Sequence, residues 1–510
     1  MIRKTQFIIF FMVLLCLLVS GCGSQKTSQN EWDGTLKISL RADPPRLDPC
    51  YSAAVVDRFV FQGLFDKLVD LDSTGKIVPM LAESWDISSD GLVYTLHLRH
   101  DVKFHDGTDF NADAVVFNIN EGRKKESNRK SELTFVNDVK ALNDDTVQIT
   151  LKKPFSPFMS VLTDRAGMIR SPEAVKKYGV DFARHPVGTG PFVFVDRLKG
   201  DSITLEKNPN YWGKGDKAPK AQRIIYKIIE DPNIALVNLK SGQIDFADYL
   251  PFNQIESYKT DPVFTVSDEP TLGFSGFYLN IKKDTFADTR VRKAIELLID
   301  RDAIVKVALS GVATPGRTAY APMSFAWTDF DKPHKPDIAQ ARQLLQEAGK
   351  DQGLSFSICT DTNPINGTLV QMLQKMMRDG GIDMQIEKYD FGTLLAKGKK
   401  GSFDALMVSW SGRIDPDQNI YTWLYSDSSN NYCKYNNPEF DQILDEARVS
   451  LDMDKRKALY SQASEILDRD IPYVFLYHAH NLYGMRRDVK GYVPSPDGMV
   501  KPVSMYKSTD

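Results

Sequence analysis

The first 22 residues constrain the fold of this chain more than any other segment. Two basic residues precede an unbroken apolar run over residues 7–19, and Ser20 and Gly21 lead from that run to Cys22. This order is typical of a secretory signal peptide, and 13 apolar residues are too few for a membrane span, which needs about 20. The remainder is therefore expected to fold outside the cytoplasm, without ATP or cytosolic reductant.

The place of Cys22 is similar to that of the lipidated cysteine in the bacterial lipobox. That resemblance implies that residues 1–21 are cleaved off as a lipoprotein signal peptide after a diacylglyceryl thioether forms on Cys22. Residues 22–33 are mostly small and polar, as a tether between lipid and fold should be. An ordinary signal with an incidental cysteine is the alternative.

Charge and length exclude some classes of protein. The 510 residues include 64 basic and 67 acidic side chains, with no long run of like charges, so we expect no nucleic-acid partner. The length predicts two to three domains with ample core, and we expect a monomer. After Cys22 only Cys50, Cys359 and Cys433 remain, without CxxC spacing. They predict no disulfide framework, although a single bridge stays open.

Hydrophobic periodicity predicts a mixed α/β fold. Apolar and polar residues alternate over 36–40, 93–98 and 146–151, which indicates half-buried strands. Helical spacing follows Asp288 and Pro336, and another helical run starts near Phe440. Turns are expected at Ser89-Asp90-Gly91 and Asp106-Gly107, and Gly188-Thr189-Gly190-Pro191 should be a sharp entry to a strand rather than a phosphate loop.

Several motifs occur in a fixed order along the chain. They are Leu-Ala-Glu-Ser-Trp at 81–85, Asp-Gly-Leu-Val-Tyr at 90–94, Val-Lys-Phe-His-Asp-Gly-Thr at 102–108, Gly-Thr-Gly-Pro-Phe at 188–192, Lys-Asn-Pro-Asn-Tyr-Trp at 207–212, Ser-Gly-Gln-Ile-Asp at 241–245 and Asp-Thr-Arg-Val-Arg-Lys-Ala-Ile at 288–295. Together they resemble the family 5 extracellular solute-binding proteins of bacterial ABC importers. Members of that family bind dipeptides, oligopeptides, glutathione or nickel.

The resemblance implies a two-lobed periplasmic-binding-protein fold, class II-like, in which a hinge closes the lobes over a ligand cleft. Lobe one would comprise residues 34–72, 188–273 and 479–510, with an extra domain inserted at 73–187. Lobe two would comprise residues 274–478. The closed form would be recognised by the ABC permease subunits in the membrane.

The main candidate for ligand binding is the loop after a predicted buried strand at 405–410. Trp410 is followed by Arg413, Asp415 and Asp417, where peptide-binding relatives carry an aspartate for the ligand's ammonium group. Arg413 in that place favours a carboxylate, while Asp415 or Asp417 could still receive an ammonium. The alternative is an Arg413–Asp415 ion pair on a solvated loop.

Weaker candidates lie elsewhere along the expected cleft. Arg165 occupies a position where some metal-chelate-binding relatives hold a carboxylate, although a salt bridge to Asp164 would explain it equally well. The resemblance also places Tyr51 and Ser52 on the cleft, and Asp361 follows the apolar strand expected at 354–359.

The residue pattern gives little support for a metal-binding protein or a hydrolase. His478 and His480, or His97, His100 and His105, lack the partners of a metal site, so we expect no protein-held metal and no cofactor. Gly273-Phe274-Ser275-Gly276 misses the nucleophile spacing of a hydrolase, which makes a secreted hydrolase a remote alternative and predicts a protein that is not an enzyme.

The sequence therefore predicts an extracytoplasmic, lipid-anchored binding protein on the periplasmic side of a membrane or on the cell surface. Its ligand would be a short peptide, di- or oligopeptide or glutathione-like, or another small zwitterionic or anionic solute. A nickel chelate is the alternative ligand.

Overall fold

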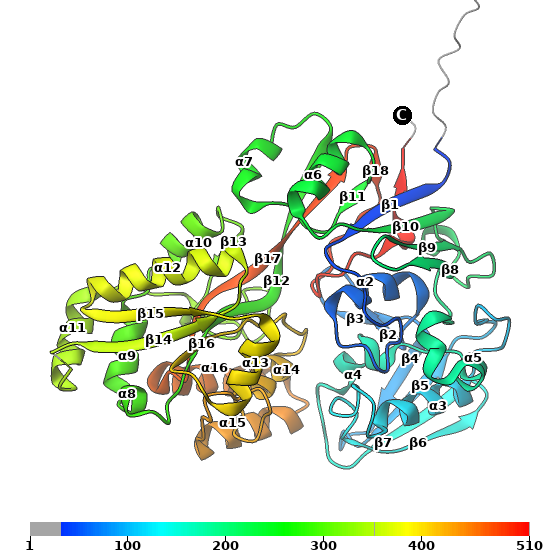
Figure 1. The fold of residues 1–510 in the computed structure, drawn as a ribbon. Helices are drawn as coiled ribbons and strands as arrows, with labels where there is room; N and C mark the ends of the chain where they lie inside the picture. The colour runs from blue at the N-terminus through cyan, green and yellow to red at the C-terminus, as the bar shows by residue number, and fades with distance from the viewer. Residues whose placement is uncertain (1–31, 351, 509–510) are drawn as a thin grey trace, which may run out of the picture.

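The computed structural model describes residues 32–350 and 352–508 as two lobes joined by long strands (Figure 1). The predicted signal peptide, Cys22 and nearly all of the tether lie outside the described residues. Within those residues, no helix is both long and apolar enough to cross a membrane. Cys50, Cys359 and Cys433 are buried free thiols.

One large mixed sheet runs through both lobes. Its strands follow the order β15-β14-β16-β12-β17-β11-β1-β10-β9-β8, and β13 pairs with β17 off this path. Their bounds are β1 (Thr35–Leu40), β8 (Phe192–Leu198), β9 (Ser202–Lys207), β10 (Arg223–Ile228), β11 (Phe246–Ala247), β12 (Phe264–Leu279), β13 (Ala313–Pro315), β14 (Leu354–Thr360), β15 (Ile382–Lys388), β16 (Ala405–Met407) and β17 (Tyr473–Arg486).

The antiparallel pair β12 and β17 connects the lobes. Its register runs from Phe264 opposite Arg486 to Tyr278 opposite Tyr473, with an irregularity between Pro270 and Phe274. Figure 1 shows the two strands crossing together from one lobe to the other. The lobe boundaries expected at 273/274 and 478/479 fall inside these strands, next to the Phe274–His478 pair. A continuous two-stranded ribbon therefore takes the place of a flexible linker.

The first lobe is built on β1 and β8–β11, with α2 (Val55–Leu64) packed on one face. Apolar side chains that alternate along these strands, such as Leu36, Ile38 and Leu40, form its core with Phe61 of α2. Trp32, at the end of the expected tether, packs against this core. Helices α6 (Pro232–Ser241) and α7 (Ile255–Tyr258) pack around a smaller core beside it.

The segment expected as an inserted domain contains a separate sheet in the order β4-β5-β7-β6, with its own core. Ala174 and Phe182, which follow this sheet, instead join the core of the first lobe. The elements of this part are β2 (Val69–Leu71), β3 (Ile77–Pro79), β4 (Ala82–Ile87), β5 (Val93–Leu98), α3 (Ala112–Arg123), β6 (Val136–Asn143), β7 (Thr146–Leu151), α4 (Phe158–Val161) and α5 (Pro172–Tyr178).

The second lobe is a sheet covered by helices on both faces. Alternate residues enter two cores: Phe277 and Met407 face one core, whereas Tyr278 and Leu406 face the other. The first core packs against α8 (Asp284–Ala287), α9 (Thr289–Leu297), α10 (Arg301–Ala308), α11 (Ile338–Glu347) and α12 (Pro364–Asp379). The second packs against α13 (Phe391–Lys400), α14 (Pro416–Leu424), α15 (Pro438–Val449) and α16 (Met453–Asp470). A short hairpin of β18 (Val489–Lys490) and β19 (Tyr506–Lys507) lies near the C-terminus.

The α/β prediction is confirmed, and the structure contains its expected elements with one difference in length. The three alternating segments form β1, β5 and β7, and Asp288 caps α9 by accepting a hydrogen bond from the Arg290 N–H. The helix expected after Pro336 begins at Ile338 and is capped by Asp337. Gly91 and Gly107 adopt positive φ in the two expected turns. The strand expected over 405–410 is shorter, because β16 ends at Met407 and only Trp410 pairs again, with Phe274.

Candidate functional site

The loop after β16 is held in one conformation by backbone contacts and one buried amide. Trp410 and Phe274 exchange backbone hydrogen bonds of 2.9 and 3.0 Å. Gly412 has φ +75°, and a Cβ there would lie 2.3 Å from the carbonyl carbon of Leu272, so only glycine fits. The buried Asn419 side chain accepts hydrogen bonds from the Trp410 indole (3.0 Å) and the Arg413 N–H (2.6 Å).

Arg413 lies on this loop without a carboxylate partner. Its Nη1 donates to Ser411 Oγ (3.0 Å) and Gly412 O (2.6 Å), and its guanidinium carbon is 4.9 Å from the centre of the Trp410 ring. In the described part of the chain, Arg413 forms no ion pair. The alternative of an Arg413–Asp415 pair is therefore not found.

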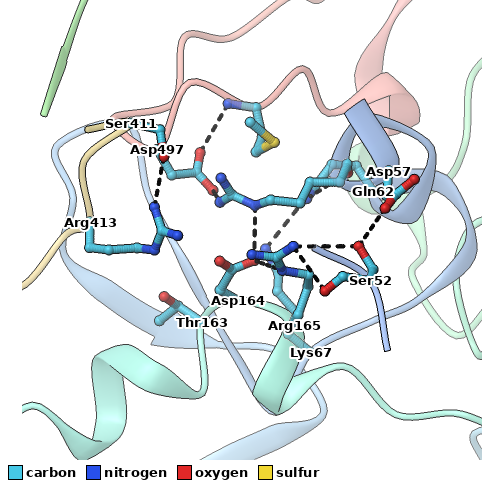
Figure 2. A network of polar contacts seen from close by, with 12 residues as sticks. Ser52, Asp57, Gln62, Lys67, Thr163, Asp164, Arg165, Ser411, Arg413 and Asp497 are labelled. Atoms are coloured by element: carbon cyan, nitrogen blue, oxygen red, sulfur yellow. Dashed lines mark hydrogen bonds and ion pairs between the residues drawn. The ribbon is translucent and has the colours of Figure 1, made fainter. Parts of the chain in front are cut away.

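A network of polar side chains lies beside Arg413 (Figure 2). The buried Arg58 contacts both Asp164 (3.0 Å) and Asp497 (3.3 Å). Arg165 lies 4.0 Å from Asp164 and donates to the backbone and hydroxyl oxygens of Ser52, each at 3.4 Å. The salt bridge to Asp164, which was the alternative explanation for Arg165, is thus present but long. The Arg165 Nε is buried without a hydrogen bond.

The network combines guanidinium and carboxylate groups. Four guanidinium groups, from Arg58, Arg129, Arg165 and Arg413, interact with the carboxylates of Asp57, Glu132, Asp164 and Asp497. The neighbouring Lys67 forms an ion pair with Asp70.

The pKa values follow from burial and from these neighbouring charges. Burial, assisted by Arg129 and Arg58, lowers the pKa of Arg165 to about 10 although Asp164 opposes the shift. Burial and the charge of Arg58 lower the pKa of Arg413. Burial alone would raise the pKa of Asp164, yet the surrounding guanidiniums hold it well below its ordinary value. One further anionic group would relieve the repulsion among the guanidiniums.

Two cavities meet at Arg413. The larger, of about 720 Å³, is lined from one side by residues 131–161 and from the other by residues 410–448. The smaller, of about 20 Å³, extends between Arg58, Asp164 and Asp497 and has room for about one water molecule. The residues that line both cavities are Glu132, Val161, Arg413 and Gln418. Arg413 is thus on the wall of a roomy space between the inserted sheet and the second lobe.

The other predicted residues lie farther from the cavities. Arg165 and Ser52 line neither cavity; Ser52 is buried and donates to Asp57 (2.6 Å). Half-buried Tyr51 lies under the Arg46 guanidinium (4.7 Å to the ring centre). Asp361 accepts hydrogen bonds from the N-terminal residues of α12. The structure therefore brings together Trp410, Arg413 and, behind them, Arg165 with Ser52.

Asp415 and Asp417 require a correction, because neither is available for an ammonium group. Asp415 caps α14 and accepts two hydrogen bonds from Arg456 of α16, at 2.6 and 3.0 Å. Asp417 is paired with Arg448 of α15 at 2.8 Å. Both carboxylates are buried and join helices of the second lobe, and Asp417 also lines the larger cavity together with Arg448.

Direct contacts between the inserted sheet and the second lobe close one side of the larger cavity. The Ser156 N–H donates to Arg448 O (2.8 Å), and the Arg448 guanidinium carbon lies 5.1 Å from the ring centres of both Phe135 and Phe155. Those two rings are stacked 4.2 Å apart. We call Ser156, Phe135, Phe155 and Arg448 the interlobe contact.

Sequence reasoning missed several residues of the site, namely Arg58, Glu132, Asn419 and Asp497, and treated Asp164 only as a partner of Arg165. The available signal was a charge next to an apolar run, as in Val161-Leu162-Thr163-Asp164. Of the histidines, His478 is buried against Gly273 O (3.3 Å) and His480 bonds Asp268 (2.7 Å). Among the described residues, no group of three or more His, Cys, Asp or Glu side chains could hold a metal ion.

Comparisons of the sequence with known proteins point to one family. Residues 76–432 match the model of the bacterial extracellular solute-binding proteins, family 5. The chain is 32% identical over 469 residues to the glutathione-binding protein GsiB of Escherichia coli, covering 89% of this chain and 90% of that protein.

Solved structures with the same fold include two at 28% identity. The periplasmic binding protein DppA of Helicobacter pylori, in complex with the peptide STSA, matches with TM-score 0.81 at 28% identity and covers 93% of this chain and 98% of that one. NikZ of Campylobacter jejuni, in complex with Ni(L-His), matches with TM-score 0.80 at 28% identity and covers 91% and 97%.

Proposed function

Because this chain belongs to the bacterial extracellular solute-binding proteins, family 5, we propose that it captures a short peptide between its lobes and delivers it unchanged to an ABC permease. The peptide class includes di- and oligopeptides and glutathione-like ligands, in keeping with the glutathione-binding and peptide-bound relatives. The protein acts as a monomer that carries a solute and performs no chemistry.

The observation that carries the ligand assignment is the unpaired Arg413 on the cavity wall. A guanidinium binds a carboxylate by donating two parallel hydrogen bonds. The guanidinium of Arg413 lies over the indole ring of Trp410, which supports its orientation. The guanidiniums of Arg58 and Arg129 lower the pKa of Arg413 by repulsion, so an anionic group beside Arg413 is favoured. A ligand carboxylate would supply the missing counter-charge.

Ligand binding is coupled to lobe closure because the larger cavity has walls from two parts of the molecule. A ligand that contacts both walls binds the closed arrangement more tightly than an open one, and only this difference can shift the population. The β12–β17 ribbon is the element around which the lobes would move.

A thermal-shift screen of the chain from residue 24 onward tests the proposal. The panel contains di-, tri- and oligopeptides, glutathione, and nickel with and without histidine or citrate. A ligand at 100 times its dissociation constant stabilises the native state by about 2.7 kcal/mol, which raises the melting temperature measurably. A shift with peptides or glutathione supports the proposal, and no shift with any peptide overturns it.

The role of Arg413 is tested by calorimetry with the ligand found in the screen. Arg413→Ala should weaken binding by about 2–5 kcal/mol, the range for removing one partner of a desolvated, hydrogen-bonded charge pair. Arg223→Ala is the matched control, because that arginine pairs with Glu206 on the exposed face of β10. Unchanged affinity in Arg413→Ala would remove Arg413 from the site.

A nickel chelate is the second candidate ligand. NikZ, at 28% identity, was solved with Ni(L-His), and an anionic chelate would also satisfy Arg413 without metal ligands from the protein. A thermal shift that requires nickel together with histidine or citrate would assign the protein to metal uptake instead.

The proposed location is outside the cytoplasm, with the mature chain anchored to the membrane through a lipid on Cys22. The leader composition supports this anchor. Mass spectrometry of the N-terminal peptide should find a diacylglyceryl group on Cys22, and an unmodified peptide that begins elsewhere would contradict it.

A further inference from the structure

The neck between the two cavities has an acid on one wall and a base on the other. Glu132 comes from the inserted segment, and Arg413 comes from the strand-end loop of the second lobe; both line the small and the large cavity. The two side chains form no ion pair with each other, although each lies within the other's electrostatic influence. A gap between opposite charges therefore opens onto a space large enough for a solute.

Arg129 holds one carboxylate oxygen of Glu132, and the other oxygen is available to a ligand. Its Oε1 accepts a hydrogen bond from Arg129 Nη1 (2.6 Å), and Arg129 is itself fixed by donating to Ser52 O (2.9 Å). The other oxygen, Oε2, has no partner within the described ranges. The side chain is 25% exposed, so it can still reach a ligand.

Four other acids near Arg413 form ion pairs with other arginines. Asp415 and Asp417 are paired with Arg456 and Arg448. Asp164 and Asp497 both contact Arg58. Among the described residues, Glu132 is the only acid that lines both cavities. A cationic group bound next to Arg413 would thus meet Glu132 first.

We propose that Glu132 and Arg413 together recognise an α-amino-acid head group, in which a free ammonium and a free carboxylate sit on the same carbon. The carboxylate binds the Arg413 guanidinium, and the ammonium binds Glu132 across the neck. The rest of the ligand extends into the larger cavity along Tyr421 and Tyr425. This inference rests on the proposed function, because it names the part of the solute that the same site recognises.

The head-group requirement separates two kinds of peptide. An ordinary α-linked peptide has its ammonium and carboxylate at opposite ends, so it cannot place both in the neck at once. A γ-glutamyl peptide keeps both groups on one carbon, and so does a free amino acid. The site should therefore prefer a γ-linked peptide over its α-linked isomer, which has the same atoms and the same net charge.

The test is calorimetry of the mature protein with γ-glutamylglycine and α-glutamylglycine. The wild type should bind the γ-isomer about ten- to hundred-fold more tightly, the range for one hydrogen bond to a charged group. Glu132→Gln should weaken the γ-isomer by a similar factor and leave the α-isomer within about two-fold. Glu126→Gln, an exposed acid in the same segment, is the matched control and should change neither affinity.

A ligand-side change distinguishes direct contact from a structural effect. N-acetylation of the γ-isomer removes the ammonium, so it should weaken binding to the wild type and cause little further loss in Glu132→Gln. Full additivity of the two changes would overturn the contact. Equal affinity of the wild type for both isomers would overturn the inference while leaving the proposed function standing, whereas binding of neither isomer nor any other peptide would overturn both.

Discussion

At the scale of single residues, the buried carboxylate of Asp66 shows how one side chain ties distant motifs together. It accepts hydrogen bonds from Thr189 (3.0 Å), Tyr211 (3.0 Å) and Trp212 (2.8 Å), which belong to two of the motifs in the sequence. Burial raises the pKa of Asp66 to about 6, although these three hydrogen bonds oppose the shift. The motifs thus serve the fold rather than ligand chemistry.

The raised pKa of Asp66 predicts a pH effect on stability. The folded state binds the proton more tightly than the unfolded state, whose aspartate pKa is about 3.9, so this group loses stability as pH rises from about 4 to about 6, by up to about 3 kcal/mol. Asp66→Asn removes that loss. The stability of the variant relative to wild type, measured by denaturant unfolding, should therefore improve between pH 4 and 7.

Asp70 provides a control of opposite sign. Burial would raise its pKa, but Lys67 and Lys501 hold it well below the ordinary value. Its stabilisation is present above about pH 4 and is lost only at lower pH. The cost of Asp70→Asn should therefore stay nearly constant between pH 4 and 7. A parallel pH dependence of the two variants would contradict the interpretation.

At the scale of elements, Asp415 joins two helices of the second lobe. It caps α14, and it neutralises Arg456, which is buried in α16 and also bonds Tyr460 (2.9 Å). A cap alone is worth about 1 kcal/mol, whereas a buried charge without its partner costs about 3–5 kcal/mol. The position next to Arg413 in sequence had indicated a ligand role that this packing excludes.

Asp415→Ala should therefore lower the free energy of unfolding by several kcal/mol. Asp300→Ala is the matched control, since Asp300 caps α10 through the Ala303 N–H (2.9 Å) and forms no ion pair among the described residues. That variant should lose about 1 kcal/mol. Equal losses in urea unfolding of the two variants would show that the Arg456 pair contributes little.

At the scale of the whole molecule, the interlobe contact joins the inserted sheet to the second lobe. Arg448 lies on the stacked rings of Phe135 and Phe155, and the Ser156 N–H binds its carbonyl. Cation–π contacts and neutral hydrogen bonds each contribute about 1 kcal/mol. These contacts hold the two parts together independently of any ligand contact at Arg413.

Loss of the Arg448 side chain, which removes the cation–π contacts and keeps the backbone hydrogen bond from Ser156, should shift the molecule toward open forms. Arg448→Ala combined with Asp417→Asn, which leaves no buried carboxylate alone, should lower the closed-to-open ratio about 5- to 30-fold for a loss of 1–2 kcal/mol. Small-angle scattering should then give a larger radius of gyration. Arg469→Ala, an exposed residue of α16 paired with Glu439 and Asp470, should leave the scattering unchanged. Identical scattering of the double variant and wild type would contradict this role.

Much of the fold was predictable because its signals are local. Alternation over six residues gave β1, β5 and β7, and helical spacing after Asp288 gave α9, since each pattern reflects burial of one face of one element. The continuity of β12 and β17 across both lobes was not predictable, because strand pairing joins residues about 200 positions apart.

The sequence by itself determined the α/β class and the family and indicated Arg413 as a candidate, since these depend on residue identity and short-range order. Only the tertiary structure decided which charges are free. Arg58 meets Asp164 across 106 positions and Asp497 across 439, and Asp415 meets Arg456 across 41. Electrostatic pairing acts through space over a few ångströms, so distance along the chain carries no information about which carboxylate is already neutralised and which guanidinium still needs a partner.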